Sequence, residues 1–442
     1  MKTRIQYIWE LLSGSFWFMP LMLIILYIFA ATGLIYLDSI SSWQPQGAFA
    51  YIMPASTESA RAVLSVMAGA MLGVAGTVFS ITLVALTMAS SNLGPRLLRN
   101  FMYKRLNQFV LGAFVALFLY ALVVLQSVKS AGDNEFIPYL SVFFTLVASL
   151  LNIFMLVVFI HQISVSIQAD YVISDVNKNL NKSIRRLFPV GLGEVPDTIN
   201  HTAAWEEACS RLPVESVLYQ EGNGYLQAIE NENLMELASD NDLVITLDYR
   251  PGDYIVEKTE LVSVRAKDKT GEELEKKIRD CFILGKVRTP TQDAEFAIHQ
   301  MVEVAARALS KGVNDPYTAL TCIDKLTASL CYLVRARFPE AFRYDQDNVL
   351  RMKTRPVSFA GMMDASFNLI RQSSEDNPSV VIRMAEGLGK IYLLAQGKQE
   401  KDAVLRHAQM IYRLAEKSFT EKNDLEDLKV RFQNVDLPFF QS

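Results

Sequence analysis

The chain has 442 residues, of which 51% are hydrophobic and 20% are charged, with only 4 cysteines and 4 histidines. These averages conceal a division, because residues 1–168 hold 8 Lys/Arg and 5 Asp/Glu whereas residues 169–442 hold the remaining 35 and 42. A water-soluble surface needs roughly a quarter of its residues charged, so the first part cannot be a soluble domain and the second can. The composition therefore excludes a secreted disulfide-rich protein, a disordered chain and a purely soluble enzyme.

The first part contains four nearly uncharged stretches that are long enough to cross a bilayer, which takes about 20 apolar residues in a helix. A cleaved signal peptide is the alternative for the first stretch. The long segment before it, which contains Glu10, and the lack of a clear cleavage site disfavour that alternative. We therefore expect a transmembrane domain over residues 1–168, with spans at about 16–37, 62–89, 107–128 and 138–161.

Basic residues collect in the loops on one side of these spans, as the positive-inside rule requires for cytoplasmic loops. The other two loops hold only Arg61 and Lys129 as basic residues. This pattern predicts a multi-pass protein with both termini and the C-terminal part in the cytoplasm, where its cysteines stay reduced. The basic residues on the cytoplasmic side include Lys2, Arg4, Arg96, Arg99, Lys104, Arg105, Lys178, Lys182, Arg185 and Arg186.

The second span carries small and hydroxylated residues at helical spacing, which places them on one face. One interpretation is close packing of helices, of which Gly-x-x-x-Gly is the usual signature. The other is a narrow water-filled path, and the two can coexist in a symmetric oligomer. The candidate pore-lining residues are Ser65, Gly69, Gly73, Gly76, Ser80 and Thr87. The opposite face, with Val66, Leu72, Val74, Phe79 and Leu83, suits lipid or the core of the bundle.

The basic cluster after the second span also has two interpretations. Arg96, Arg99, Lys104 and Arg105 are either an ordinary anchor or a cytoplasmic mouth that attracts anions or phospholipid headgroups. In the fourth span, Asn152 lies near the middle and His161 near the inner end. An ionisable group inside a span is a candidate functional residue, but the interfacial position of His161 favours a solvated anchor.

The fourth span is expected to continue as a helical stalk over residues 169–188, because apolar residues recur there every three or four positions. If the helix is unbroken from Pro138, it is about 50 residues long, or roughly 75 Å. A stalk of this length favours an oligomer. Residues 189–204 contain glycine and proline and are expected to form a linker. The apolar residues of the stalk are Val172, Val176, Leu180, Ile184 and Leu187.

Residues 205–270 change period and contain short β-type runs, with a turn at Arg250-Pro251-Gly252-Asp253. The order of these runs resembles the barrel-sandwich hybrid domains related to lipoyl carriers, although the carrier lysine has no counterpart. We therefore expect a small β-barrel or barrel-sandwich-like domain. The expected strands are Val214–Tyr219, Gly224–Ile229, Leu243–Leu247, Tyr254–Glu257 and Leu261–Val264.

Residues 271–442 are expected to form an α-helical bundle, which makes the cytoplasmic part α+β. Thr289, Pro290 and Gln292 fit a helix start with threonine as the N-cap. Asp315 and Pro316 fit the start of the next helix. Further helices are expected near 316–337, 356–373, 378–396 and 400–420.

Several polar residues of this bundle form a possible ligand or anion site, because helix N-termini with a nearby arginine bind anions readily. Helix caps and a salt bridge are the simpler explanation. The six residues are Arg288, Thr289, Gln292, Asp293, Asn314 and Asp315.

The sequence gives little support for catalysis. His299, Glu303 and Arg307 share a helix face, but an ion-paired surface explains them. Glu386–Lys390 lacks the spacing of a phosphate-binding loop. We therefore expect no catalytic residue, no metal site and no cofactor. The net charge of −7 in residues 169–442, from 35 basic and 42 acidic residues, argues against nucleic acid as a partner.

Two motifs carry a resemblance to a known family. Residues 73–86 and 308–319, together with Gly94-Pro95-Arg96 and Arg288-Thr289, resemble the bacterial predicted-membrane-protein family known as domain of unknown function 2254. The resemblance extends over nearly the whole chain and implies an inner-membrane protein without supplying an activity. Family members often have proline in place of Lys311 and arginine in place of His299, which weakens any role for these two residues.

These observations lead to a functional hypothesis of a homo-oligomeric inner-membrane pore or ion channel. The second span would line the path, and the cytoplasmic part would act as a vestibule or regulator. The expected partners are the lipid bilayer, copies of the same chain and inorganic ions. The alternative is a non-conducting membrane scaffold or sensor whose cytoplasmic domain binds partners. A secondary transporter is weaker, because the spans show no internal repeat and no buried acid.

Overall fold

The computed structural model describes residues 17–41, 47, 49–94, 105–129, 135–188 and 201–433. The chain divides into two compact units, Met1–Tyr171 and Val172–Ser442. The basic residues Arg96, Arg99 and Lys104 lie outside the described residues, and so does residue 16 of the first expected span.

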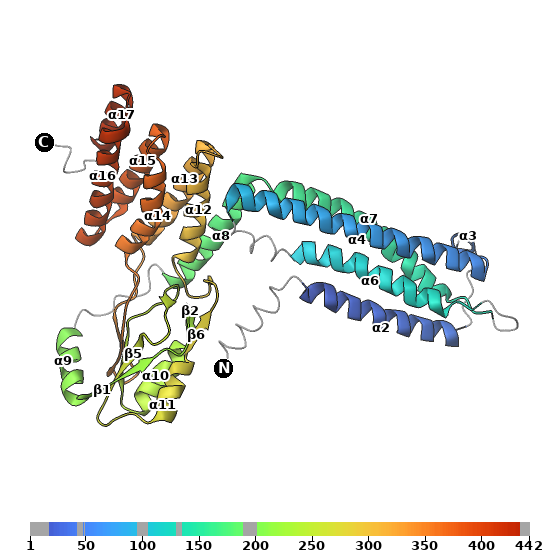
Figure 1. The fold of residues 1–442 in the computed structure, drawn as a ribbon, viewed down its shortest axis with the longest axis horizontal. Coiled ribbons are helices and arrows are strands. Elements are labelled where there is room, and N and C mark those ends of the chain that lie inside the picture. The colour runs from blue at the N-terminus through green and yellow to red at the C-terminus, as the bar shows by residue number, and fades with distance from the viewer. Residues whose placement is uncertain are drawn as a thin grey trace. The chain divides into compact units, whose positions relative to one another are not determined.

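The first unit contains the four apolar helices that the sequence predicts. They are α2 (Phe18–Ile40), α4 (Thr57–Leu93), α6 (Arg105–Ser127) and α7 (Tyr139–Ser166), and each is long and apolar enough to cross a membrane. A short helix, α3 (Phe49–Ile52), precedes α4. Figure 1 shows α6 lying between α2 and α4, and α6 also contacts α7. The central position of α6 agrees with buried residues on several of its sides, including Gly112 and Ala116 on one side and Phe114 and Leu117 on another.

A second face of α4, which is rich in alanine and is called the alanine face below, packs against the other helices of the unit. It was not evident from the sequence. Its residues repeat every three or four positions and are all buried, so they form the contact of α4 with the core. Val66, Leu72, Phe79 and Leu83 are exposed instead. These four residues therefore lie outside the core of the bundle, and Leu72, Phe79 and Leu83 lie beside the small-residue stripe, so their expected place opposite it is wrong. The buried face consists of Ala60, Leu64, Ala68, Met71, Ala75, Val78, Ala85 and Ala89.

The expected continuous helix through the fourth span is interrupted. Helix α7 ends at Ser166 and α8 (Ala169–Leu187) begins three residues later. The hydroxyl of Ser164 donates to the carbonyl of Ile160 at 2.9 Å, a back-bond that bends helices. The N–H of Gln168 then bonds to Val165, three residues back, which ends the regular ladder. The unbroken stalk of about 50 residues is therefore wrong, although α8 occupies the stalk segment.

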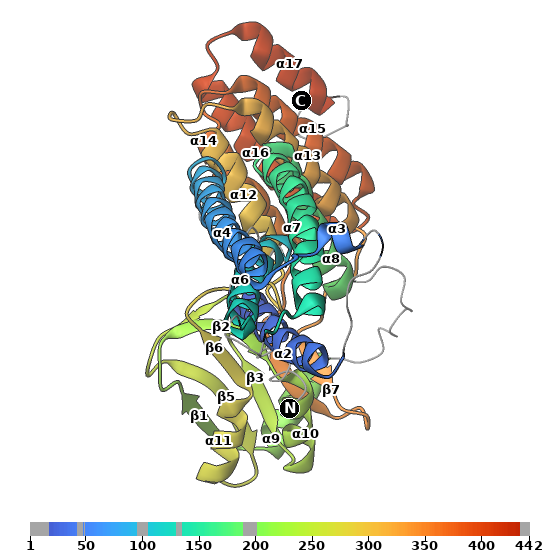
Figure 2. The same ribbon diagram turned by 90° about the vertical axis from the view of Figure 1, so that its right-hand side faces the viewer.

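The second unit is a mixed α+β structure with two open sheets (Figure 2). The strands described form no closed barrel, so the barrel-like detail is not confirmed. The larger sheet has the order β1-β5-β3-β8-β7, and the smaller sheet has the order β4-β2-β6. The strands are β1 (Val214–Tyr219), β2 (Gly224–Ile229), β3 (Val244–Leu247), β4 (Tyr254–Ile255), β5 (Glu260–Ala266), β6 (Phe282–Gly285), β7 (Phe342–Tyr344) and β8 (Leu350–Thr354).

The expected boundary at residue 270 does not separate strands from helices. Strands β6, β7 and β8 belong to the segment that we expected to be entirely helical, and β8 pairs with β3 in parallel. Helix α9 (His201–Arg211) begins inside the expected linker, and α10 (Asn231–Asp240) and α11 (Glu272–Asp280) lie between strands. Long-range strand pairing explains the difference, because β8 joins its sheet through residues about a hundred positions away.

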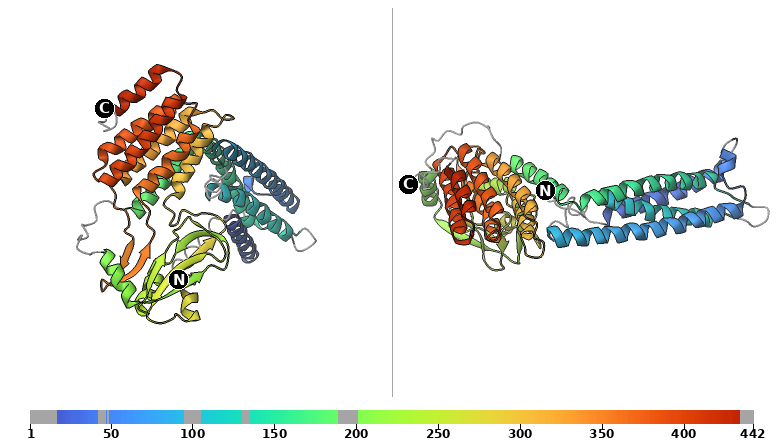
Figure 3. Two further views of the ribbon diagram at one scale, coloured as in Figure 1. Left: turned by 60° about the vertical axis from the view of Figure 1, so that its left-hand side comes forward. Right: turned by 90° about the horizontal axis from the view of Figure 1, so that it is seen from above.

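Six helices form a bundle and lie side by side in Figure 3. The starts of α13, α14 and α15 agree with the sequence prediction to within three residues. The six helices are α12 (Phe296–Ala308), α13 (Pro316–Leu333), α14 (Phe359–Ser373), α15 (Pro378–Leu394), α16 (Lys398–Ser418) and α17 (Lys422–Gln433).

Candidate functional site

The stripe of small residues on α4 faces away from the rest of its unit. All six of its residues are exposed, and they lie on the side of α4 opposite the buried alanine face. A Cβ added at Gly69, Gly73 or Gly76 would meet no atom within 4 Å. Packing within the chain therefore does not account for these glycines. The stripe (defined from here on as Ser65, Gly69, Gly73, Gly76, Ser80 and Thr87) is available to lipid, to water or to another molecule.

One hydroxyl of the stripe has its hydrogen-bond partner within α4 itself. The hydroxyl of Thr87 donates to the carbonyl of Leu83 in its own helix at 2.9 Å. The neighbouring Thr77 does the same to Gly73 at 3.2 Å. A threonine that bonds to the preceding turn tolerates an apolar environment, yet its oxygen can still accept a hydrogen bond from water.

The two ends of α4 differ in charge. Glu58 is exposed at the first turn, seven residues before Ser65, and therefore lies on the same face as the stripe. Of the basic cluster expected near the other end, only Arg105 lies in the described part, where it begins α6 and is exposed. A path along the stripe would thus begin at a carboxylate.

Polar ties join the helix ends of the first unit. The carboxylate of Asp38 accepts from the backbone N–H groups of Leu140 and Ser141 at 2.9 and 3.0 Å, and so occupies the N-terminus of α7. Arg61 donates to the carbonyl of Val128 at 2.7 Å and ties the start of α4 to the end of α6. These contacts join the ends of helices and involve no residue of the stripe.

The two polar residues of the fourth span have different surroundings. Asn152 is buried and donates from Nδ2 to the carbonyl of Ala113 on α6 at 3.3 Å, so it stabilises the interior of the unit. His161 is exposed on α7, and its solvated position stays a prediction.

The possible ligand site in the second unit is split by the structure. Four of its six residues belong to the loop of residues 288–295, which precedes α12, whereas Asn314 and Asp315 follow the end of α12. A helix of 13 residues separates the two groups, so they do not form one site. Asp315 caps α13, as expected, with its carboxylate accepting from the N–H of Thr318 at 3.2 Å.

The expected start of α12 at Thr289 is wrong, because the helix begins at Phe296. Gln292 does not complete a capping box. Its side-chain amide accepts from the N–H of Ile229 at 2.9 Å and donates to the carbonyl of the same residue at 3.0 Å. Thr289 is buried, and its hydroxyl has no hydrogen-bond partner among the described residues. A long-range contact to β2 therefore replaces the local cap that the sequence suggested.

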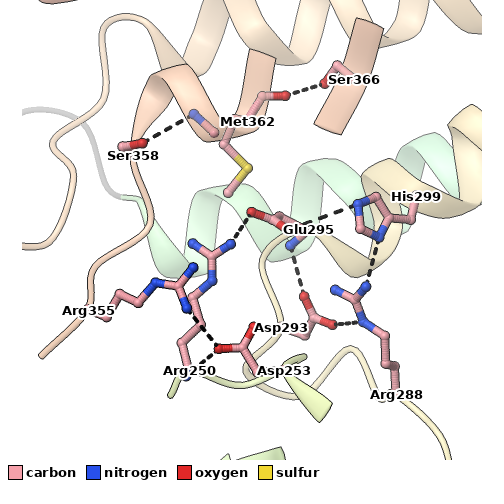
Figure 4. A network of polar contacts seen from close by, with 11 residues as sticks. Arg250, Asp253, Arg288, Asp293, Glu295, His299, Arg355, Ser358, Met362 and Ser366 are labelled. Atoms are coloured by element: carbon pink, nitrogen blue, oxygen red, sulfur yellow. Dashed lines mark hydrogen bonds and ion pairs between the residues drawn. The ribbon is translucent and has the colours of Figure 1, made fainter. Parts of the chain in front are cut away.

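Charged side chains from both sides of the 288–295 loop form a continuous network (Figure 4). Arg288 pairs with Asp293 at 2.7 Å, and Arg250 pairs with Glu295 at 2.6 Å. Because an arginine can only donate, Arg288 donates to Nδ1 of His299 at 2.9 Å, and His299 is in the tautomer protonated at Nε2. The three positive charges match the three negative ones, since Asp253 pairs with Arg355 at 3.5 Å. Among these six side chains no positive charge is left over for an anion.

The turn at Gly252 explains why the network includes Arg250. Residues 250–253 form the predicted turn, in which the N–H of Asp253 bonds to Arg250 at 3.0 Å. Gly252 has φ of +104°, and a Cβ there would lie 2.7 Å from Oδ2 of Asp293. The Pro-Gly pair signalled the turn in the sequence, but nothing local indicated that Arg250 and Glu295 would meet across 45 residues.

Comparison with known proteins places the chain in a family. Residues 13–390 match the family model described as "Predicted membrane protein (DUF2254)". The chain belongs to this family. Uncharacterised proteins of Mycobacterium bovis and Mycobacterium tuberculosis are each 29% identical over 371 residues, which covers 83% of this chain and 70% of each relative. No solved structure matches the chain.

The DUF2254 match includes both candidate regions. It begins before α2 and ends inside α15, so the stripe on α4 and the 288–295 loop lie within it, whereas α16 and α17 lie beyond it. The four apolar helices and the DUF2254 assignment agree that this is a membrane protein.

Proposed function

We propose that the protein is a non-enzymatic, homo-oligomeric pore or ion channel of the bacterial inner membrane, in which α4 lines the path for inorganic ions. The observation that carries the proposal is the outward stripe on α4, whose glycines face open space. Copies arranged around an axis would bring their stripes together. Small side chains and hydroxyls would then surround a narrow path.

The length of α4 supports its role at the centre of an assembly. It has 37 residues, about 55 Å at 1.5 Å per residue, whereas the hydrocarbon core is about 30 Å thick. In Figure 1, α4 and α7 continue past the start of α6. The last residue of the stripe, Thr87, lies six residues before the end of α4 and is exposed. A path along α4 would therefore be longer than the hydrocarbon core is thick.

The membrane setting follows from the distribution of basic residues in the sequence. We place both termini and the second unit in the cytoplasm, on the side of Arg105, and Glu58 on the opposite side. In an oligomer Glu58 would form a ring of carboxylates at the outer mouth, an arrangement that favours cations. The second unit would act as a vestibule for the path or as its regulator.

Reconstitution of the purified protein into planar bilayers tests the proposal. Gly73→Leu and Ser80→Leu would fill the path, so we expect the unitary conductance to fall at least several-fold. Ala70→Leu is the matched control, because Ala70 is exposed and lies about 100° around α4 from the middle of the stripe, and it should leave the conductance unchanged. Silence of the wild-type protein across voltage, tension and pH would overturn the proposal.

A non-conducting scaffold or sensor is the second candidate, and one observation favours it. Leu83 lies between Ser80 and Thr87 on the same face of α4 and is 47% exposed. A leucine within the stripe suits dry packing between copies better than a water-filled path. Cysteine cross-linking at Gly73 without any conductance would select this alternative, whereas cross-linking with conductance would select the pore.

A further inference from the structure

The 288–295 loop lies where α8, the small sheet and the helical bundle meet within the second unit. Arg186 of α8 donates to the carbonyls of Pro290 and Thr291, at 3.3 and 2.7 Å. The next residue, Gln292, holds both backbone groups of Ile229 on β2. Three consecutive loop residues therefore make both contacts: Pro290 and Thr291 accept hydrogen bonds from α8, and Gln292 bonds to β2.

Helix α8 is firmly held at the end that reaches this loop. Its apolar residues Ile173, Val176, Leu180 and Ile184 are buried. The guanidinium of Arg185 lies 5.3 Å from the ring centre of Tyr332, and the hydroxyl of Tyr332 donates to the carbonyl of Phe188 at 3.1 Å. A displacement along α8 would therefore move its C-terminal end as a body and carry Arg186 with it.

The rest of the loop passes such a displacement on to two further elements. Arg288 and Asp293 pack against the backbone of Gly252 in the turn between β3 and β4. Glu295 binds Arg250 of the same turn, and His299 on α12 accepts from Arg288. The contacts are directional hydrogen bonds in a segment of irregular backbone, which can shift more readily than a helix or a sheet.

We propose that Arg186 is a positioning residue that couples α8 to β2 through the 288–295 loop. Because α8 follows the apolar helix α7 after two residues, this coupling would link the membrane helix to the sheets of the second unit. Its use as a regulator of a pore rests on the function proposed above. The coupling itself is a property of the contacts and does not depend on conduction.

Hydrogen exchange on the full-length protein in detergent tests the coupling. The Ile229 amide donates directly to Gln292, so its exchange rate reports on the contact between the loop and β2. In Arg186→Gln we expect exchange at Ile229 to become about ten-fold faster, the lower end of the change that losing one hydrogen bond from a charged donor produces. Arg186→Lys keeps one donor and should restore part of the protection. Lys182→Gln removes a charge from an exposed position of α8 and should leave Ile229 unchanged.

Two reference measurements separate coupling from a general loss of stability. Gln292→Ala should accelerate exchange at Ile229 directly, and Val264 in the larger sheet should exchange at the wild-type rate in every variant. An Arg186→Gln protein with unchanged exchange at Ile229, or with equal acceleration at Val264, overturns the proposal. Bilayer recordings distinguish the two proposals, since a silent wild-type protein with coupled exchange would overturn the pore and leave the coupling in place.

Discussion

The two units of the molecule place their polar ties differently. In the four-helix unit, Asp38 and Arg61 join helix ends, and Asn152 supplies one hydrogen bond in the interior. In the mixed unit, the 288–295 loop places its ion pairs and amide contacts between sheet and helices. The first arrangement leaves long lateral faces without polar groups that a neighbour must satisfy. The second fixes internal positions, because a buried polar group that loses its hydrogen-bond partner destabilises the folded state.

The largest expected effect of a single substitution is in the mixed unit, at Gly252. Gly252→Ala puts a side chain at a positive φ and pushes its Cβ into the carboxylate of Asp293. We expect the free energy of unfolding of this unit to fall by about 2–4 kcal/mol. Pulse proteolysis in urea on the detergent-solubilised chain measures the change. Gly222→Ala is the control, since its Cβ would meet nothing within 4 Å, and equal losses in both variants would contradict the argument.

A pH dependence should appear in the mixed unit at His407. Burial, the main cause, lowers the pKa of His407 from 6.5 to about 4; the facing carboxylate of Asp364 raises the pKa, and Arg406 and Arg371 lower it. Between pH 6.5 and 4 the unfolded chain binds a proton that the folded chain does not. Stability is therefore full above pH 6.5, falls as the pH drops to 4, and loses about 3 kcal/mol over that range.

The variant His407→Gln isolates this contribution. Its stability should be lower at pH 7 because the contact with Asp364 changes, but it should vary less between pH 6.5 and 4 than that of the wild type. Urea unfolding at several pH values gives both slopes, and parallel slopes would show that His407 does not carry the effect.

The buried alanine face of α4 and the exposed stripe should respond differently to a larger side chain. Ala75→Leu overpacks the buried face and should cost about 1–3 kcal/mol. Gly73→Leu lies two residues away in open space and should not destabilise the isolated protomer, because it meets no atom and the higher helix propensity of leucine favours α4 by up to about 1 kcal/mol. Thermal unfolding in detergent, under conditions where the chain is monomeric, compares them. A larger loss for Gly73→Leu would mean that the exposed face is packed within the chain.

The smallest effect is expected at the helix ends of the four-helix unit. Asp38→Asn keeps the shape of the side chain but removes the charge at the N-terminus of α7, and should cost about 1 kcal/mol. Glu58→Gln is the control, because Glu58 is an exposed acid in the first turn of α4. If the melting temperature shifts no more for Asp38→Asn than for Glu58→Gln, Asp38 does not stabilise the N-terminus of α7 as a cap.

The parts of the fold that the sequence predicted well depend on local patterns. The four apolar helices follow from hydropathy, and the start of α13 follows from Asp315 and Pro316. The start of α12 was wrong because Gln292 binds Ile229, which lies 63 residues earlier in the chain. No pattern near Gln292 shows that its amide has a distant backbone partner.

The same distinction applies to the candidate site. The stripe on α4 could be recognised in the sequence as a helical repeat. Its outward orientation could not, because the alanine face that packs on the core is not distinguishable among the many apolar residues of this segment. The network around the 288–295 loop could be found only in part, because Arg288 and Asp293 are close in sequence whereas Arg250 is not.

The contact between Gln292 and Ile229 has a consequence for which residues each position tolerates. A carboxamide presents one donor and one acceptor side by side, as a peptide group does, so Gln292 behaves like an added residue of a neighbouring strand. Glutamate at this position would offer two acceptors and repel the carbonyl of Ile229. Position 229 takes part in these hydrogen bonds only through its main chain, so any apolar side chain that fits the buried core around Ile229 keeps them. The specificity of this joint therefore resides on one side alone.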